Sequence, residues 1–510
     1  MCGIAAIIMR PQAGRPAAPP SLETMLLQML GAIRHRGDTY HFAERVVLPR
    51  AALGANRLGI VAEENAVQPA FDAGSGSYIV MNGEIYNFRE LRDTLRGLGH
   101  AFATGGDTEV VLKAYLQWGA AAVDKLDGIF AFVIHNPETG AVFAARDHVG
   151  IKPLYFVADT DTVMFGSERK CFLGIREGVS DFPPGTYYEE GKLHSYVRHS
   201  AAAEPATPDD ADAIARCRSL LDDAVRKQVA THLPVAVVFS GGLDSTVILH
   251  LATKHHRDVT AFSIGTEDSP DLEFAKRYCA DLGVPHVVLP FSKEQAVRTI
   301  PDAIFDGELF EPIDISDMVN MSAVYSAIRA NGFKVALSGD GSDEIFAGYD
   351  LFKQVDDPAA LSTYRLNNLY RTDLQRTDRS SMKHSIECRV PFLDREVVSF
   401  AMSLPFELKV RNGIEKFILR EAFRPEIPQY MIERPKIRMP EGIGIDDHVF
   451  KTLANGQIYA GGPELLIDSP QAANAIFQFV KFGFDAPSVR NKRQEWDYFP
   501  GGYFRFNEHK

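Results

Sequence analysis

Residues 235–245 read VAVVFSGGLDS, and this stretch decides the class of fold of the carboxyl-terminal half of the chain. The run from Val235 to Phe239 is apolar throughout, which is typical of a strand buried on both faces of a sheet. A glycine-rich turn follows, and a helix is predicted over 245–256. Such a turn presents backbone N–H groups and the positive end of the helix dipole to an anion. The stretch therefore predicts an α/β sheet with an anion-binding loop, although a loop that only caps the helix would have the same pattern.

The sequence around this stretch alternates between short apolar strands and helices. Strands are predicted at 259–264, 287–289 and 334–337, and helices at 211–230, 272–282 and 322–330. This alternation is typical of a parallel sheet. A second glycine-rich segment, SGDGSDE at 338–344, follows the last strand, and we expect the two loops to converge at one edge of the sheet. Asp244 and Asp343 would then offer hard oxygen ligands for Mg²⁺, or they would only cap helices.

The first 190 residues follow a different pattern. Short β-rich segments at 51–55, 77–81, 128–134 and 141–145 alternate with Gly and Pro turns, and helices are predicted at 22–33 and 87–98. Strands this numerous predict sheets that pack on each other and are covered by helices. Residues 200–210, SAAAEPATPDD, have the small, polar, proline-containing composition of a linker. We therefore predict domains at 2–190 and 211–510, joined by a linker at 191–210.

Composition excludes several classes of protein. The 510 residues include 54 Lys and Arg against 67 Asp and Glu, and the resulting net charge of −13 argues against a nucleic-acid or anionic-membrane partner. No apolar run approaches the roughly 18 residues needed to span a bilayer, and the opening CGIAAIIM lacks the basic flank of a signal peptide. Five scattered cysteines match neither a disulfide framework nor a zinc site. We therefore expect a cytoplasmic enzyme.

Cys2 is a candidate nucleophile because it directly follows the initiator methionine. Removal of that methionine would place the thiol beside an α-amine, which can act as its general base. In the ordinary interpretation, Cys is merely a small second residue. Three further positions could bind parts of a substrate: Arg57 a carboxylate, Asn82 to Glu84 an oxyanion and Asp107 an ammonium. Each position also has an ordinary interpretation. Arg57 could form a surface ion pair, 82–84 could be a turn, and Asp107 could cap a helix at 108–118.

The motifs MCGI, HRG, RLGIV, NGEIYN, GDTEV, LDGIFAF, RDHVGIKPLY and FGSE occur in that order and resemble the class II glutamine amidotransferase domain over nearly all of 2–190. The resemblance implies an N-terminal nucleophile αββα sandwich in which Cys2 releases ammonia from glutamine. It implies an oxyanion hole at Asn82 and Gly83. It also implies glutamine binding by Arg57, Leu58, Gly59, Ile60, Val61, Asn82, Gly83, Glu84 and Asp107. The family usually has Pro-Asp after HRG, whereas Asp38-Thr39 follows here, so we expect this loop to close differently.

The SGGLDS loop resembles the pyrophosphate loop of adenylating enzymes. With SMKHSIECRVPFLD and KFILREAF, it resembles the synthetase domain of the glutamine-hydrolysing asparagine synthetase family over about 209–450. The resemblance implies a parallel-sheet α/β adenylating domain that uses ATP and Mg²⁺, with Asp244 and Asp343 as metal ligands. It implies catalytic positions at Asp340 and Lys436, where the lysine stabilises charge during acyl-adenylate chemistry. The implied ATP-binding residues are Val238, Ser240, Gly241, Gly242, Asp244, Ser245, Ile264, Ser338 and Gly339.

Two departures concern the acceptor substrate. Asp340 stands where asparagine synthetases usually carry Glu; the carboxylate is retracted by one methylene, about 1.5 Å, and we expect activity to survive. The segment Glu308–Met318, ELFEPIDISDM, contains four acids and no cation. A pocket for a dianionic amino acid needs positive charge, which Arg389, Arg420 or Lys436 could supply. We expect Glu311, Asp314 and Asp317 on a loop before a helix near Ser322, where they either line the acceptor pocket and repel aspartate or face solvent.

Three functions are compatible with these observations. The first is synthesis of asparagine from aspartate, ATP and glutamine. The second is amide formation by the same mechanism on another carboxylic acid, in secondary metabolism. The third is an inactive regulatory homologue, which is disfavoured because Cys2, SGGLDS and Lys436 are all present. The predicted partners are glutamine, ATP and a carboxylate acceptor, with neither nucleic acid nor membrane, and a homodimer is left open.

Overall fold

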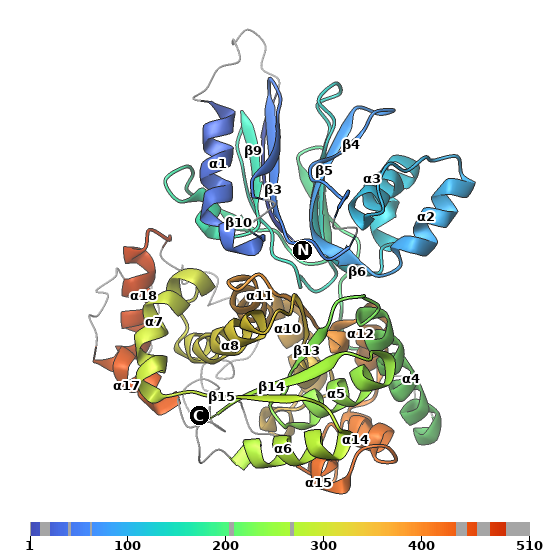
Figure 1. Ribbon diagram of the computed structural model, residues 1–510, viewed down its shortest axis with the longest axis vertical. Helices are drawn as coiled ribbons and strands as arrows, with labels where there is room; N and C mark the ends of the chain where they lie inside the picture. The colour runs from blue at the N-terminus through green and yellow to red at the C-terminus, as the bar shows by residue number, and fades with distance from the viewer. Residues whose placement is uncertain are drawn as a thin grey trace.

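The chain forms two lobes, one above the other in Figure 1. The computed structural model describes residues 2–10, 21–38, 42–61, 64–202, 209–265, 270–434, 446–455 and 470–485. Strands β1 to β12 form the first lobe, and the parallel sheet with its helices forms the second. In the described residues, no helix is both long and apolar enough to cross a membrane.

The first lobe is a sandwich of two six-stranded antiparallel sheets. A core that includes Ile4, Val80 and Val133 fills the space between the sheets. Helix α1 (Leu22–Ala32) packs on the outer face of one sheet, and α2 (Phe88–Gly97) and α3 (Asp107–Trp118) cover the other. The predicted αββα sandwich is thus confirmed. In spatial order the strands of the first sheet are β10 (Ser180–Asp181), β8 (Tyr155–Ala158), β9 (Thr162–Gly166), β1 (Cys2–Met9), β3 (Ala51–Arg57) and β2 (Glu44–Val47), and those of the second are β12 (Lys192–Ser195), β11 (Thr186–Glu189), β7 (Val142–Arg146), β6 (Gly128–His135), β5 (Ser77–Ile85) and β4 (Ala70–Asp72).

The second lobe is built on a five-stranded parallel sheet, which confirms the predicted α/β class. Its strand order is β15 (His286–Pro290), β14 (Val259–Gly265), β13 (Val235–Val238), β16 (Val335–Leu337) and β17 (Glu387–Arg389). After β15 the chain crosses to the other side of β13, so β13 and β16 flank the point where the strand order reverses. In open α/β sheets, ligands bind at this point. The two glycine-rich loops follow these two strands.

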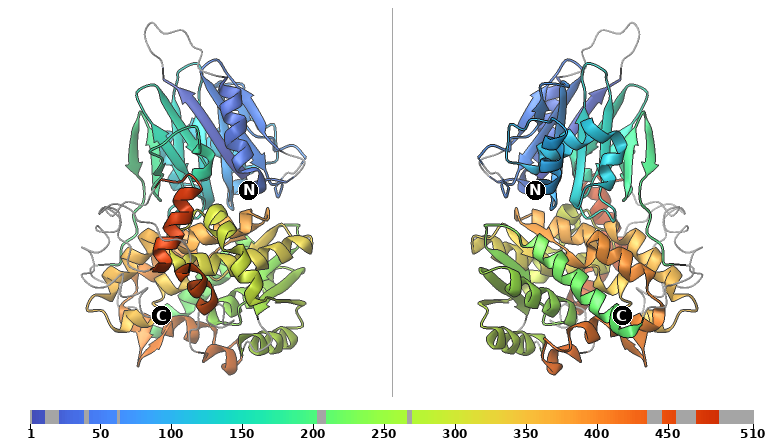
Figure 2. Two further views of the ribbon diagram at one scale, coloured as in Figure 1. Left: turned by 90° about the vertical axis from the view of Figure 1, so that its left-hand side faces the viewer. Right: turned by 90° about the vertical axis from the view of Figure 1, so that its right-hand side faces the viewer.

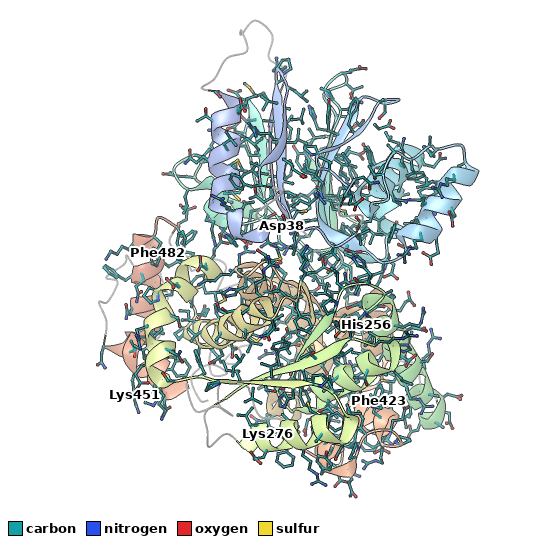
Figure 3. The ribbon with its side chains drawn as sticks, in the orientation of Figure 1. Asp38, His256, Lys276, Phe423, Lys451 and Phe482 are labelled. Carbon is teal, nitrogen blue, oxygen red and sulfur yellow. The ribbon has the colours of Figure 1, made fainter. Side chains whose placement is uncertain are left out.

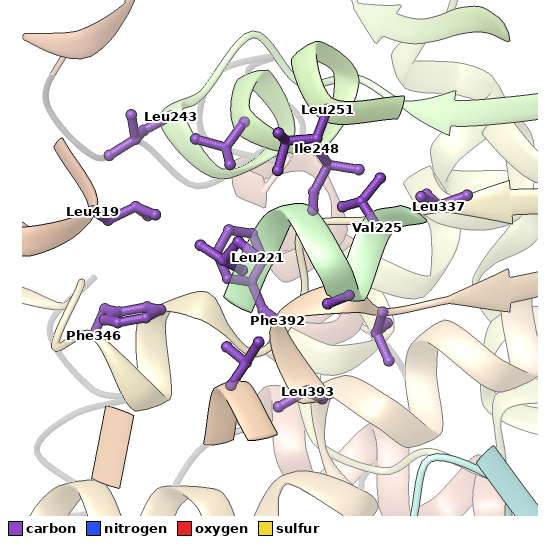
Figure 4. Close-up of a cluster of buried hydrophobic side chains, with 14 of the residues drawn as sticks. Leu221, Val225, Leu243, Ile248, Leu251, Leu337, Phe346, Phe392, Leu393 and Leu419 are labelled. Carbon is purple, nitrogen blue, oxygen red and sulfur yellow. The ribbon is translucent and has the colours of Figure 1, made fainter. Parts of the chain in front are cut away.

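Helices cover both faces of this sheet. On one face, α4 (Asp210–Gln228) and α5 (Leu243–His255) bury Leu221, Val225 and Ile248 against Phe392, as Figure 4 shows. The opposite face is covered by α7 (Lys293–Gly307) and α8 (Pro312–Ala330), which α17 (Asp446–Ala454) and α18 (Pro470–Lys481) flank (Figure 2, red). The other elements are α6 (Pro270–Leu282), α9 (Ser342–Ile345), α10 (Pro358–Asn368), α11 (Asp373–Met382), α12 (Arg395–Ser403), α13 (Phe406–Lys409), α14 (Phe417–Phe423), α15 (Gln429–Ile432), β18 (Val410–Arg411) and β19 (Ile414–Glu415).

The prediction of a loop before Ser322 is wrong, because α8 already begins at Pro312. Proline is well suited to the first position of a helix, where its missing N–H would have no partner. Ile315, Met318 and Val319 then fall on the buried side and pack into the core. The apolar pattern therefore continues through a segment whose proline and acids resembled a loop.

Buried charges fill the junction between the lobes. Arg36 donates to both carboxylate oxygens of Asp378, on α11, at 2.7 and 2.9 Å, and to Glu168 of its own lobe at 2.6 Å. The neighbouring Arg379 pairs with Glu308 at 2.8 Å. Burial alone would raise the pKa of Asp378, but Arg36, Lys152 and Arg379 together outweigh it, and the pKa is lowered. Glu308, expected near the acceptor pocket, is instead part of this junction.

Candidate active sites

Cys2 lies at the start of β1, where the first lobe faces the second (Figure 1). Its side chain is buried, and its Sγ accepts a hydrogen bond from Gln68 Nε2 at 3.3 Å. Burial raises the pKa of the thiol, and a hydrogen bond from the Leu58 backbone N–H opposes this rise. A raised pKa keeps the thiol protonated, so nucleophilic attack requires a base close to the sulfur. Gln68 Nε2 also donates a hydrogen bond to the Met81 carbonyl, and Gln68 Oε1 accepts one from the Met81 N–H. No pattern in the sequence had indicated Gln68 as a site residue.

Asn82 and Gly83 lie side by side on β5, next to the nucleophile. Asn82 Oδ1 accepts a hydrogen bond from the Cys2 backbone N at 3.3 Å, while Asn82 Nδ2 is buried with no hydrogen-bond partner among the described atoms. A buried donor without a partner costs about 1–3 kcal/mol, which suits a group that is completed by its ligand. A Cβ at Gly83 would lie 2.2 Å from the Ile129 carbonyl oxygen, so no larger residue fits. This geometry fits an oxyanion hole.

Two buried carboxyl groups, Glu84 and Asp107, lie close to this site. Asp107 begins α3, but its side chain accepts the backbone N–H of Ile85 at 3.0 Å, so it does not act as the helix cap. Burial raises the pKa of both groups, and Asp107 raises that of Glu84 further. Arg389 reaches from β17 to within 3.8 Å of Glu84 and pairs with Glu387 at 2.5 Å. The expectation that Arg389 supplies charge to the acceptor pocket is therefore wrong.

The segment 57–61 connects the surroundings of Cys2 to the second lobe. Arg57 Nε lies 3.3 Å from the carboxylate of Glu44, and the next residues, Leu58 and Ile60, pack on Val335 and Met382. Gly59 accepts a hydrogen bond from Lys334 Nζ at 3.0 Å through its carbonyl and donates its N–H to Asp38 at 3.4 Å. Val61 is half-buried. Asp38 lies at the lobe junction in Figure 3, and Thr39, the next residue of the altered loop, falls outside the described residues.

The second site is a cavity of about 150 Å³ at the carboxyl ends of β13 and β16. Gly241 adopts a positive φ of 74°, and Gly242 is the N-cap of α5, so the loop turns directly into the helix. The Ser240 and Ser245 hydroxyls lie 3.1 Å apart across this turn. Ile264 is buried at the end of β14 and is not among the residues that line the cavity. The predicted residues that do line it are Val238, Ser240, Asp244, Ser245, Asp317, Ser338, Gly339, Asp340 and Asp343.

Asp244 and Asp343 converge on one cation, the ammonium of Lys416. The distances are 2.7 and 2.6 Å to the two Asp244 oxygens and 2.6 Å to Asp343 Oδ1. Among the described residues, no group of three or more His, Cys, Asp or Glu is arranged to hold a metal. Two carboxylates that share one cation nevertheless fit Mg²⁺, which binds proteins through one or two carboxylates and takes its remaining oxygen ligands from substrate phosphates and water. Lys416 is the first residue of the KFILREAF motif, but no pattern in the sequence singled it out.

Arg376, on α11, is the cation at the other end of this cavity. It pairs with Asp373 at 2.6 Å and with Asp317, and it lies 3.8 Å from Asp340. Asp340 accepts hydrogen bonds from Ser338 and Thr377 at 2.6 and 2.8 Å, and burial raises its pKa. Asp373 and Arg376 are three residues apart, and opposite charges at this spacing on a helix are expected to pair. The sequence could therefore have indicated this ion pair.

Glu311, Asp314 and Arg420, which were also expected at the acceptor pocket, are not among the residues that line this cavity. Burial raises the pKa of the Asp314 carboxyl group to about 8, so it is largely neutral at pH 7. Arg420 pairs with Glu415 and does not line the cavity either. Glu311 is the N-cap residue of α8. Lys436 falls outside the described residues.

An αββα sandwich with an amino-terminal cysteine, followed by a parallel sheet with loops at its switch point, defines a two-lobed glutamine amidotransferase of the ligase type. Family models agree: the glutamine amidotransferase domain matches residues 1–209, and asparagine synthase matches 216–359 and 353–458. The chain belongs to the glutamine-hydrolysing asparagine synthetase family.

Two asparagine synthetases support this membership over most of the chain. Asparagine synthetase [glutamine-hydrolyzing] 3 of Arabidopsis thaliana is 32% identical over 473 residues, covering 87% of this chain and 79% of the relative. Asparagine synthetase [glutamine-hydrolyzing] 1 of Saccharomyces cerevisiae is 31% identical over 560 residues, covering 97% and 96%. Among solved structures, a glutamine phosphoribosylpyrophosphate amidotransferase from B. subtilis is 17% identical, with a TM-score of 0.30. The match covers 56% of this chain and 65% of the B. subtilis chain.

Proposed function

We propose that this chain catalyses glutamine-dependent amide synthesis. Cys2 releases ammonia from glutamine in the first lobe, and the ammonia attacks an acyl-adenylate, made from ATP and a carboxylate, in the second. Aspartate is the first candidate acceptor, with asparagine, AMP and pyrophosphate as products, because the relatives are asparagine synthetases. The observation that carries the proposal is the buried Cys2 thiol next to the unpartnered donor of Asn82, in one chain with two glycine-rich loops at a switch point. The proposed division is a glutaminase domain at 2–190, a linker at 191–210 and a synthetase domain at 211–510.

In the glutaminase half, the α-amine left after removal of Met1 accepts the proton of the Cys2 thiol. The thiolate attacks the amide carbon of glutamine, and Asn82 Nδ2 with the Gly83 N–H stabilises the oxyanion. The α-ammonium returns this proton to the amide nitrogen, which leaves as ammonia, and water then hydrolyses the thioester to glutamate and the free thiol. Residues 57–61, Glu84 and Asp107 bind the glutamine, with Arg57 directed at its carboxylate and Asp107 at its ammonium.

In the synthetase half, Gly241 and Gly242 bring backbone N–H groups and the N-terminus of α5 to the pyrophosphate portion of ATP. Val238 and Ile264 match the family's adenine-contacting backbone positions, and of these two Val238 lines the cavity. Ser338 and Gly339 contact the ribose and phosphate. Asp244 and Asp343 would hold Mg²⁺, which neutralises phosphate charge when bound. Asp340 and Lys436 complete the catalytic set of the acyl transfer. The partners are small molecules, the proposed location is the cytoplasm, and the oligomeric state is left open.

Oxygen labelling tests the adenylation step. The acceptor carboxylate attacks the α-phosphorus and pyrophosphate leaves; ammonia then displaces AMP, which keeps one carboxylate oxygen. Acceptor labelled with oxygen-18 should therefore give labelled AMP, as measured by mass spectrometry. Label in free phosphate would mean an acyl-phosphate route and would contradict the proposal.

One observation favours a second candidate, an acceptor other than aspartate. Arg376 is the cation among the residues that line the cavity, and Asp317, Asp373 and Asp340 surround it. A guanidinium already neutralised in this way binds a second substrate carboxylate poorly. Acceptors with an amine, a hydroxyl or less negative charge would suit the cavity better. Pyrophosphate release across a panel of carboxylic acids, with glutamine present, decides between the two candidates.

Replacement of Asp317 with Asn should raise kcat/KM for aspartate. The change removes one negative charge and leaves Arg376 with fewer anionic partners, so the gain should be about tenfold for each 1.4 kcal/mol of repulsion removed. Asp314→Asn is the matched control, because this carboxyl group lies on the same helix and its pKa is raised to about 8. If wild-type enzyme already uses aspartate with a low KM and Asp317→Asn has no effect, the acidic cavity does not select the acceptor.

A further inference from the structure

A large cavity lies between the lobes, outside both proposed active sites. Its volume is about 700 Å³, and its walls come from residues 124–127 of the first lobe, from residues 197–202 and from α12 of the second lobe. Sites for small organic ligands have volumes of roughly 300–1,000 Å³. None of the residues that line this cavity is proposed to bind glutamine or ATP. The cavity is therefore not explained by the function proposed above.

The three walls of the cavity are tied to one another. The Ala202 N–H donates to the Met402 carbonyl at 3.1 Å, which joins the segment 197–202 to α12. Arg395, at the start of α12, donates to the Asp124 carbonyl at 3.1 Å and so joins this helix to the first lobe. Figure 1 shows α12 at the edge of the second lobe that faces β6. The cavity is thus largely preformed, as sites for small molecules usually are.

A narrow space extends the cavity towards buried residues. It shares Leu126, Asp127 and Arg395 with the cavity, and its volume of about 10 Å³ has room for one small polar group. Gln228 and Tyr86 also line it, and Gln228 is only 1% exposed. Gln228 Oε1 and the Tyr86 hydroxyl are both buried without a hydrogen-bond partner among the described atoms. Buried polar groups are rarely left unpaired, so this end of the cavity suits a ligand that donates hydrogen bonds.

The narrow end also has an excess of negative charge. Lys227 is shared by two carboxylates that line this end, Asp127 at 2.7 Å and Asp394, so its single positive charge neutralises only one of them. Arg395, a second cation there, lies 3.6 Å from the carboxylate of Asp124. An ammonium group carries one positive charge and donates three hydrogen bonds. It would complete both the charge and the hydrogen bonding of this end.

The wide end has an excess of positive charge. Apart from the residues just described, its charged groups are Arg198, Lys125 and Glu396, two cations and one acid. Within the described part of the chain, the Arg198 side chain forms neither a hydrogen bond nor an ion pair, so it can receive an anion without losing a partner. The cavity as a whole therefore suits a ligand with a positive group at one end and a negative group at the other.

We propose that this cavity binds a small zwitterion of the amino-acid type, either a free amino acid or a short peptide, with its ammonium in the narrow end and its carboxylate on Arg198. Gln228 Oε1 and the Tyr86 hydroxyl accept hydrogen bonds from the ammonium, and the Arg198 guanidinium donates to the carboxylate. Such a ligand contacts both lobes and the segment that joins them. Its binding should therefore stabilise the arrangement of the lobes and raise the Tm.

Isothermal titration calorimetry of the full chain with two probes tests this proposal. L-Leucine represents the free amino acids, because Leu126, Val197 and Met402 add apolar surface to the lining, and tri-L-alanine represents the short peptides. At least one of the two should bind wild-type protein with a Kd of about 1 mM or less and should raise its Tm. N-acetylation of that probe removes its ammonium and should weaken binding at least about tenfold.

Two variants test the two ends of the cavity. Arg198→Gln removes the cation of the wide end and should weaken binding of the same probe at least about tenfold. Gln228→Leu should weaken it by a similar factor. Because this change also removes a buried acceptor that has no partner, the variant without ligand should melt at or above the Tm of wild type. Arg216→Gln is the matched control, because Arg216 is also an exposed arginine but lies on α4 and does not line the cavity; it should bind the probe as wild type does.

Three results would overturn the proposal: neither probe binds wild-type protein at about 1 mM, the N-acetylated probe binds as tightly as the free one, or Arg198→Gln binds as tightly as wild type. The last result is also the one expected of a probe that occupies the glutamine site instead. Arg198 is exposed, so its replacement should not disturb folding, and the test stands even if Gln228→Leu fails to fold. No titration contains ATP, glutamine or an acceptor. The outcome is therefore independent of the proposed amide synthesis, which the oxygen-18 experiment tests separately.

Discussion

Replacing Cys2 with alanine should abolish glutamine-dependent product formation, by about a thousandfold or more, while synthesis from added ammonium salts continues at the wild-type rate. The reason is the separation of the two chemistries. Cys2 lies at the edge of the sandwich, whereas the glycine-rich loops belong to the other lobe. Product formation with each nitrogen source in turn, measured by chromatography, gives the comparison.

Cys171→Ala is the matched control for this experiment. Cys171 is also a buried free cysteine of the first lobe, and its thiol has no part in the proposed chemistry. The control should use glutamine and ammonium as wild type does. If Cys2→Ala lost both activities equally, the division into two sites would be wrong. Mass spectrometry of active wild-type protein should also show that the chain begins at Cys2, because a retained Met1 would block the α-amine.

Replacing Asp378 with alanine should lower the free energy of unfolding by about 3–5 kcal/mol. Asp378 neutralises Arg36 across the lobe junction through two hydrogen bonds, and both side chains are almost fully buried. The substitution removes two hydrogen bonds from the buried Arg36 guanidinium and leaves it with Glu168, a carboxylate that Lys170 also contacts at 2.8 Å. Removing one partner from such a buried charge network is costly. Thermal and urea denaturation of the variant and of wild type should show the loss.

Glu23→Ala is the control for this prediction, because it removes an exposed partner of Arg45 in the first lobe. Exposed pairs contribute only about 0–1 kcal/mol, so this variant should unfold close to wild type. Equal stability of Asp378→Ala and Glu23→Ala would mean that the junction does not depend on the buried pair. The lowered pKa of Asp378 also predicts that this stabilisation is present above the unfolded pKa of an aspartate and is lost as the pH falls through the lower folded pKa.

The sequence alone determined the class of each lobe. The apolar run at 235–239 with its glycine-rich turn, and the alternation that follows, predicted the parallel sheet, because these signals depend on residues a few positions apart. Ordered motifs likewise predicted the sandwich. The start of α8 was missed because acids and a proline resemble a loop locally, whereas packing against the sheet makes the segment helical.

Only the tertiary structure decided which charges meet. Lys416 lies 172 residues from Asp244, and Arg36 lies 342 residues from Asp378, so no spacing in the sequence could pair them. The same holds for Arg389, which faces Glu84 rather than the acceptor cavity. Motifs identify residues that can do chemistry, because side-chain chemistry is local. Partners, burial and hence pKa depend on where folding places distant segments. This is why the pairing of Lys416 with Asp244 and of Arg389 with Glu84 had to come from the three-dimensional arrangement.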